Sequence, residues 1–195
     1  MRGSIKPVAF ATSNRGKIEE ARIVLSPFGM AVRPFNGKGL EIQAETVSEV
    51  AAFSAEVASR KHGRALIVED AGLFVDSLQG FPGPFSSYVY KTLGIGGLLS
   101  LLEGARSRRA SFRSAVAYCE PAGEPRVFEG LVTGRISKSP SGENGFGFDP
   151  VFVPTGSRRS MGQLTLMQKC EVSHRGEALR KFAAWYTSSN SGQLF

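Results

Sequence analysis

Two neighbouring stretches in the middle of the chain constrain the fold more than any other feature. Residues 110–119 and 126–136 both read as β-strands, and a turn-rich segment, residues 121–125, separates them with two prolines and a glycine. Two strand-like runs joined by such a turn predict a β-hairpin, whose strands are antiparallel. The hairpin therefore excludes a purely parallel, Rossmann-type sheet.

The N-terminal half instead alternates strands and helices. Apolar runs predict strands, glycines mark where helices end, and Thr46 and Glu49 have capping-box spacing at the start of a helix. The expected elements are strands at 8–12, 65–68 and 73–75, a turn at 13–16, and helices that end at Gly29 and Gly63. Together with the hairpin, this alternation predicts a mixed α/β or α+β fold with a mixed sheet.

In the C-terminal half of the chain, irregular segments separate the expected helices and strands more often. We expect irregular backbone at 80–84, a helical region at 88–103 broken at 94–97, a glycine-rich loop at 137–148, a last helix from Ser173, and a frayed tail at 187–195. The 195 residues fit one domain, so residues 1–195 are expected to form a single unit.

The formal net charge of +7 favours an anionic partner. The densest basic runs, residues 106–109 and 158–159, are not interleaved with aromatic residues, so no stable nucleic-acid partner is expected. No run approaches the roughly 20 apolar residues that cross a bilayer. The two cysteines lack metal-type spacing. We expect a soluble, cytoplasmic protein with a small anionic ligand.

The first candidate site is the strand-to-helix turn Thr12, Ser13, Asn14, Arg15, Gly16 and Lys17. Backbone N–H groups at a helix start attract anions, and Lys17 falls in the first helical turn, where the helix dipole disfavours a cation. A bound phosphate would offset that cost. An ordinary turn with a solvated lysine is the alternative that the spacing leaves open.

The second candidate site is the acidic pair Glu69 and Asp70, which follows an apolar strand and precedes Ala71 and Gly72. Magnesium prefers a few carboxylate oxygens together with phosphate oxygens. We expect the pair at a strand end, where ligands gather in open sheets. A simple acidic turn is the alternative. Glu41, flanked by apolar residues, is a third candidate carboxylate.

Two further segments combine aromatic and basic residues. Residues 145–150 bracket Phe146 and Phe148 with glycines and end in Asp149, an arrangement that permits stacking of a base, although a packed aromatic turn is the alternative. His174 and Arg175 open the last helix, with Lys169 just upstream. They repeat the cation-at-helix-start pattern of Lys17, which makes a shared anionic ligand more credible.

These segments, in this order, resemble the inosine triphosphate pyrophosphatase (Ham1-like) family, and the local amino-acid sequence is most similar to its archaeal branch. The motifs are Thr12-x-Asn14-x-x-Lys17, Val68-Glu69-Asp70-x-Gly72, Gly80-Phe81-Pro82-Gly83, Gly145-Phe146-Gly147-Phe148-Asp149-Pro150 and Ser173-His174-Arg175, spanning residues 8 to about 182. The resemblance implies a two-lobed fold around a long mixed sheet, with the active cleft between the lobes, and a homodimer. It also implies magnesium-dependent hydrolysis of ITP, dITP and XTP to the monophosphate and pyrophosphate.

The resemblance also implies a role for each matching residue. Asp70 would act as general base and bind magnesium with Glu41, Glu69 would support the metal site, and Lys17 would both bind the triphosphate and take part in catalysis. The remaining residues would contact the substrate: Thr12, Ser13, Asn14, Arg15, Gly16, Ala71, Lys91, Phe146, Gly147, Phe148, Asp149, Lys169, His174 and Arg175.

The chain departs from the family pattern at Phe53, where relatives carry a polar residue, and at residues 161–164. Two rival functions stay open: a pyrophosphatase that prefers other bases, such as modified pyrimidines, and a non-catalytic nucleotide- or RNA-binding module. Three carboxylates beside a phosphate turn favour the enzyme, because a module that only binds anions has no use for them.

Overall fold

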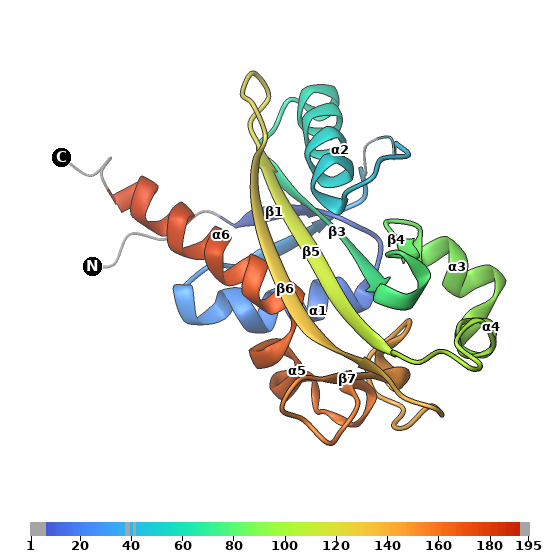
Figure 1. Ribbon diagram of the computed structural model, residues 1–195. Coiled ribbons are helices and arrows are strands. Elements are labelled where there is room, and N and C mark those ends of the chain that lie inside the picture. The colour runs from blue at the N-terminus through green and yellow to red at the C-terminus, as the bar shows by residue number, and fades with distance from the viewer. Residues whose placement is uncertain (1–6, 38–39, 41, 192–195) are drawn as a thin grey trace.

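The computed structural model describes residues 7–37, 40 and 42–191, and it describes the side chains as far as residue 189. The described residues form one seven-stranded mixed sheet, in which six strands follow the order β2-β1-β3-β5-β6-β7 and β4 pairs with β3 (Figure 1). The strands are β1 (Val8–Ala11), β2 (Val32–Phe35), β3 (Leu66–Val75), β4 (Pro82–Gly83), β5 (Arg109–Cys119), β6 (Arg126–Ile136) and β7 (Phe152–Pro154).

The sheet changes from parallel to antiparallel at β3. Strands β2 and β3 both run parallel to β1, whereas β5 pairs antiparallel with β3, β6 with β5, and β7 with β6. The predicted hairpin is β5 and β6, so the expectation of a mixed sheet is confirmed.

The described residues also form six α-helices, which pack around this sheet: α1 (Arg15–Leu25), α2 (Val47–His62), α3 (Ser86–Thr92), α4 (Gly94–Leu101), α5 (Leu166–Val172) and α6 (His174–Ser191). Side chains of α1 and α6 share an apolar cluster with Ile67 and Val116, whereas α2 packs with Leu66 and Val68. Because successive strand residues point to opposite faces, α1 and α6 cover one face of the sheet and α2 covers the other (Figure 1). Within the described residues, none of the helices combines the length and apolar character needed to span a membrane.

Local sequence signals place the helix ends correctly. Thr46 accepts a hydrogen bond from the N–H of Glu49 while the Glu49 carboxylate accepts from the N–H of Thr46, so the predicted capping box is present. Gly29 and Gly63 close their helical segments in the left-handed conformation, at φ of 70° and 59°. Glycine adopts this conformation without the steric cost that a Cβ brings.

The prediction that a strand ends at Glu69 and Asp70 is wrong. Both residues lie in the middle of β3, a continuous ten-residue strand that pairs with β5 along its whole length. Gly72, expected in a turn, is needed for close approach: a Cβ there would lie 2.2 Å from the carbonyl oxygen of Gly83 in β4. The glycine therefore admits a neighbouring strand and does not break its own.

Other differences are smaller. The break in the helical region falls at Leu93, and the glycines from Gly94 onward begin α4. Helix α6 continues to Ser191, so residues 187–191, expected in the frayed tail, are helical, and residues 192–195 lie outside the described part. Strands β2 and β7 and helix α5 carried no sequence prediction, and β4 lies within residues 80–84, which were expected to be irregular.

The long strands β3 and β5 carry a second apolar cluster near their other ends. On the face covered by α6, Leu73 and Phe112 pack with residues of α3, α4 and β7. Between this cluster and the one around Ile67 and Val116, the same face presents Glu69 and Ser114. A band of buried polar groups thus separates two apolar clusters on this face of the sheet.

The contact between β6 and the start of α6 predicts a stability effect. A Cβ on Gly130 would lie 1.9 Å from the carbonyl oxygen of His174, which is backbone and unable to swing away. We expect Gly130→Ala to lower the free energy of unfolding by about 1–3 kcal/mol, the usual cost of overpacking, in chemical denaturation.

Gly96→Ala is the matched control, because no atom lies within 4 Å of a Cβ built at this position in α4. It should leave the free energy of unfolding unchanged or raise it by up to about 1 kcal/mol. Equal stability of the two variants would contradict the close contact.

Candidate active site

The predicted phosphate turn is a well-formed helix start. Thr12 is buried at the end of β1, and its hydroxyl accepts a hydrogen bond from the N–H of Asn14 at 3.1 Å. Asn14 is the N-cap of α1 and accepts from the N–H of Lys17 at 3.2 Å. Ser13 and Arg15 are exposed. The turn therefore directs the Lys17 side chain inward, across to β3.

Glu69 lies at the centre of the buried polar band. Lys17 Nζ lies 2.9 Å from Glu69 Oε2, and Arg175 Nε lies 3.0 Å from Glu69 Oε1. These two contacts are ion pairs by distance without the alignment of hydrogen bonds. The Ser114 hydroxyl donates to Oε1 at 2.6 Å, and Lys17 also donates to the Glu69 carbonyl at 3.0 Å. One carboxylate thus receives cations from two different helix starts.

Arg175 continues the charge contacts to a second buried carboxylate. Its Nη1 donates to Glu20 Oε2 at 2.7 Å, and Lys169 Nζ donates to Glu20 Oε1 at 2.8 Å. Glu20 comes from α1 and is only 1% exposed. The sequence reasoning missed it, although a glutamate beside Ile18 and Ala21 on the apolar stripe of a helix was the available signal.

The turn formed by residues 145–150, which we name the aromatic turn, provides the third carboxylate. Asp149 Oδ2 accepts from Lys169 Nζ at 2.5 Å and from the N–H of Phe146 at 2.7 Å, so the acid holds its own turn together. Phe146 lies beside the cations: Lys169 Nζ is 4.5 Å and Arg175 Cζ is 5.2 Å from the ring centroid. Such distances are typical of cation–π contacts.

These six side chains form one alternating chain of charges. The order is Lys17, Glu69, Arg175, Glu20, Lys169 and Asp149, and each interior member contacts two opposite charges. Three cations face three carboxylates, so the chain is neutral as a whole. We name it the ion chain.

The surroundings keep both glutamates of the ion chain ionised. Burial opposes ionisation of Glu20, but Arg175 and Lys169 outweigh it and lower its pKa to about 2. Burial acts on Glu69 in the same way, and Arg175 and Lys17 hold its pKa well below the ordinary range. Burial raises the pKa of Asp149, and the Lys169 ammonium opposes that rise.

Asp70 lies on the opposite face of the sheet from Glu69. It is adjacent to Glu69 in β3, and its even-numbered neighbours Leu66 and Val68 pack toward α2. Phe53, on α2, is half-buried. Glu41, the expected partner of Asp70, lies outside the described residues. Within the described part, no three His, Cys, Asp or Glu side chains are grouped to hold a metal ion.

The side chains of several predicted contact residues lie apart from the ion chain. Phe148 is 3% exposed and packs in the second apolar cluster, with its ring centroid 5.4 Å from that of Tyr90. Lys91 is exposed near the end of α3. Ala71 is half-buried in β3, and Gly147 adopts a φ of 64° in the aromatic turn. The packed-turn alternative thus describes Phe148, and for Phe146 both alternatives stay open.

His174 packs as a buried ring. It stacks on Phe112 with ring centroids 4.7 Å apart, and its Nδ1 has no hydrogen-bond partner among the described residues. Burial, assisted by the positive charge of Arg175, lowers the pKa of His174 to about 3. The imidazole is therefore neutral near pH 7.

The departure at residues 161–164 fits the fold. Met161 is fully buried in the second apolar cluster. Gln163 Oε1 accepts from the N–H of Ser160 at 3.0 Å, which caps a short helical turn. The replaced segment thus keeps its packing.

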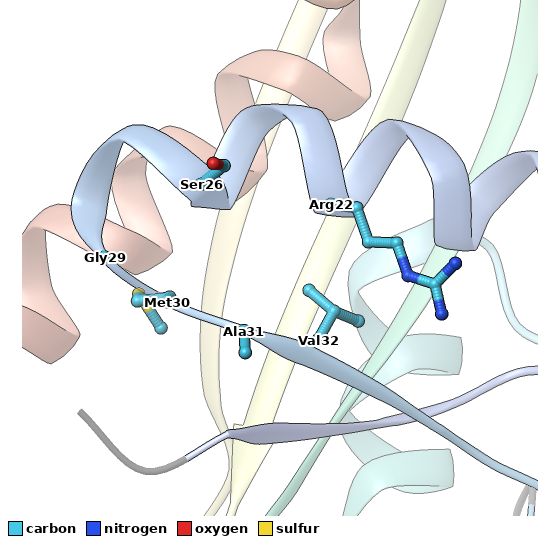
Figure 2. Close-up of a pocket in the computed structure, with 6 residues that line it drawn as sticks. All are labelled: Arg22, Ser26, Gly29, Met30, Ala31 and Val32. Atoms are coloured by element: carbon cyan, nitrogen blue, oxygen red, sulfur yellow. The ribbon is translucent and has the colours of Figure 1, made fainter. Parts of the chain in front are cut away.

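A cavity of about 170 Å³ opens beside the ion chain. Its lining residues are Gly16, Glu19, Glu20, Asn144, Gly145, Phe146, Leu164, Leu166 and Lys169. A larger, open hollow of about 470 Å³ lies between the end of α1 and the start of β2, lined by the residues in Figure 2. None of the predicted site residues lines the larger hollow, so the smaller cavity is the candidate binding site.

The architecture places the chain in a class of known structure. The HAM1 protein from Coxiella burnetii matches with a TM-score of 0.83 and 29% identity, over 94% of this chain and 100% of that one. The Staphylococcus aureus Ham1 protein matches with a TM-score of 0.81 and 30% identity over the same shares. The fold is therefore that of the Ham1 proteins.

The sequence leads to the same group. The family model described as Ham1 family matches residues 8–185, and the chain belongs to this family. A relative from Methanopyrus kandleri, named dITP/XTP pyrophosphatase, is 45% identical over 95% of this chain and 99% of its own length. One from Thermococcus kodakarensis, with the same name, is 46% identical over 91% and 96%.

The buried state of His174 predicts the acid sensitivity of the fold. The unfolded chain takes up a proton on this ring below its ordinary pKa of 6.5, whereas the folded protein resists protonation down to about pH 3. Stability is therefore lost as pH falls, by about 1.4 kcal/mol per unit within this window. The charged groups that act on the ring are Arg175, Glu69, Lys169 and Glu20.

We expect His174→Phe, which keeps the stack on Phe112, to lose about 2.5 kcal/mol less stability than the wild type between pH 7 and pH 4.5. Urea denaturation at both pH values measures the difference. Identical pH slopes for the two proteins would show that the ring is not buried in the neutral form.

Proposed function

We propose that this protein hydrolyses the non-standard purine nucleoside triphosphates ITP, dITP and XTP to the monophosphate and pyrophosphate. The observation that carries the proposal is the convergence of four separate segments. The segments 12–17, 146–149 and 169–175 meet Glu69 at the middle of β3, around the ion chain and the cavity beside Phe146. The names of the archaeal relatives support the same substrate class.

The triphosphate is assigned to the start of α1. Backbone N–H groups there attract anions, and Lys17 adds a positive charge at this end of the site. The base is assigned to the cavity, where Phe146 offers an aromatic face. Stacking on such a face contributes about 1–3 kcal/mol per base.

Arg175 explains how the site would read the base. Hypoxanthine and xanthine carry a 6-keto acceptor, which a guanidinium can meet as donor. Adenine has a 6-amino donor at that position, so Arg175 would face a donor, and an unpaired buried polar group costs about 1–3 kcal/mol. Glu20 and Glu69 also contact the guanidinium, so these carboxylates and the base would share its charge and donors.

We propose that magnesium binds at Asp70, with Glu41 as a second carboxylate. The donor set fits this ion, because magnesium bound with phosphates takes only one or two protein carboxylates. When bound, the ion would neutralise phosphate charge. Asp70 would accept the proton of the attacking water as general base. Lys17 would assist by its charge at the phosphate end.

The resemblance supports three further proposals about organisation. Residues 1–195 act as a single two-lobed domain with the substrate cleft between the lobes, two copies form a homodimer, and the protein works in the cytoplasm on the free nucleotide pool. The separation of the two apolar clusters along β3 and β5 supports the division into lobes.

A product assay tests the reaction. With magnesium and ITP, dITP or XTP, we expect pyrophosphate and monophosphate in equal amounts, ATP to be a far poorer substrate, and no activity after chelation of the metal. Release of orthophosphate alone would contradict the proposal. A preference for modified pyrimidine triphosphates, or binding without turnover, would favour one of the two rival functions instead.

The role of Asp70 is tested by substitution. Asp70→Asn keeps the size of the side chain but removes the base, so we expect kcat for ITP to fall by at least about 10²–10⁴-fold while IMP still binds. Asp76→Asn, at an exposed site just after β3, is the matched control and should retain the wild-type rate. A near-normal rate for Asp70→Asn would remove Asp70 from the catalytic step.

A further inference from the structure

Glu69 has a different set of contacts from those expected of a residue that supports a metal site. Its carboxylate oxygens lie against Lys17, Arg175 and Ser114, on the face of the sheet opposite to Asp70. Its side chain has no accessible surface in the structure. Glu69 therefore contacts two cations, and the proposed function assigns each of them to a different end of the substrate.

The two cations come from distant parts of the sequence. Lys17 belongs to the first turn of α1, at the phosphate end, and Arg175 to the first turn of α6, at the base end. Each contacts a different oxygen of the same Glu69 carboxylate. A carboxylate is a rigid, planar group, so a movement that strengthens one contact changes the other.

The two cation contacts of Glu69 also differ in geometry from the other contacts in the ion chain. Glu20 and Asp149 accept aligned hydrogen bonds from their cations, whereas the contacts of Glu69 with Lys17 and Arg175 are ion pairs without that alignment. The side chain of Lys17 is 15% exposed, while Arg175 is 3% exposed. Lys17 is thus the member of the pair that a phosphate can reach from solvent.

We propose that Glu69 is a positioning residue that couples the two ends of the substrate site by sharing one carboxylate between Lys17 and Arg175. The inference rests on the proposed function and deepens it. A change at Lys17 alters how strongly Glu69 holds Arg175, and therefore alters how well Arg175 discriminates between bases. Groups in one charge network are expected to be coupled in this way.

Base discrimination without turnover is the appropriate measurement. IMP and AMP carry the same phosphate and differ at the base, so the ratio of their dissociation constants cancels what the phosphate contributes. We expect Lys17→Met to lower the preference for IMP over AMP at least threefold in calorimetry. Without Lys17, Arg175 alone balances Glu69 and is held more tightly away from the base.

The same substitution in two other backgrounds identifies the residue responsible. In Glu69→Gln, which removes the shared charge, Lys17→Met should change the ratio less than threefold. In Glu20→Gln, the matched control, it should still change the ratio at least threefold, because Glu20 contacts Arg175 and Lys169 but the structure records no contact of Glu20 with Lys17 among the described residues.

Three results would overturn the inference: a change of less than threefold from Lys17→Met in the wild type, an equal change in the Glu69→Gln background, or loss of the effect in Glu20→Gln.

Should Glu69→Gln fail to fold, Ser114→Ala replaces it, since it removes the 2.6 Å hydrogen bond to Oε1 and leaves every charge. There the effect of Lys17→Met should fall to less than half, and an unchanged effect contradicts the coupling.

The outcomes separate this inference from the proposed function. If ITP is converted to IMP and pyrophosphate, but Lys17→Met leaves the ratio of the IMP and AMP dissociation constants unchanged, the coupling is wrong and the proposed function stands. If the wild type neither binds IMP nor hydrolyses ITP, the proposed function fails and the coupling fails with it.

Discussion

Electrostatic balance inside the protein is the constraint on which the rest of this structure depends. Burying an ion removes its hydration and costs several kcal/mol, so a buried charge persists only with partners. The ion chain satisfies this requirement for six side chains at once, and it draws them from α1, β3, the aromatic turn, α5 and α6. Loss of one member takes an opposite charge away from each of its neighbours, which ties the positions of these five segments together.

The apolar packing is arranged around this polar band. One cluster surrounds Ile67 and Val116, the other surrounds Leu73 and Phe112, and Glu69 and Ser114 lie between them on the same two strands. A site formed there is rigid on both sides because close-packed side chains flank it. The ring of His174 stacks on Phe112 at the edge of the band of buried polar groups, and because it is neutral it adds no further charge.

Sequence reasoning succeeded where the cause was local. The capping box of Thr46 and Glu49 and the glycine after α2 depend on residues within one helical turn, and they were predicted correctly. Glu20 was missed because its burial depends on Lys169, which lies 149 residues further along the chain. Gly72 was misread for a related reason: its role depends on the backbone of Gly83 in another strand. Cations at two helix starts predicted a shared site, but not that a buried carboxylate would hold them both.

Continuity of β3 places Glu69 and Asp70 in different surroundings although they are adjacent. Because strand side chains alternate, insertion or deletion of a single residue between Leu66 and Glu69 would exchange the faces of the two carboxylates. The acid that balances two cations would then point toward α2, and the ion chain would receive a side chain one methylene shorter. A change in the length of this strand would therefore take both carboxylates out of their present surroundings at once.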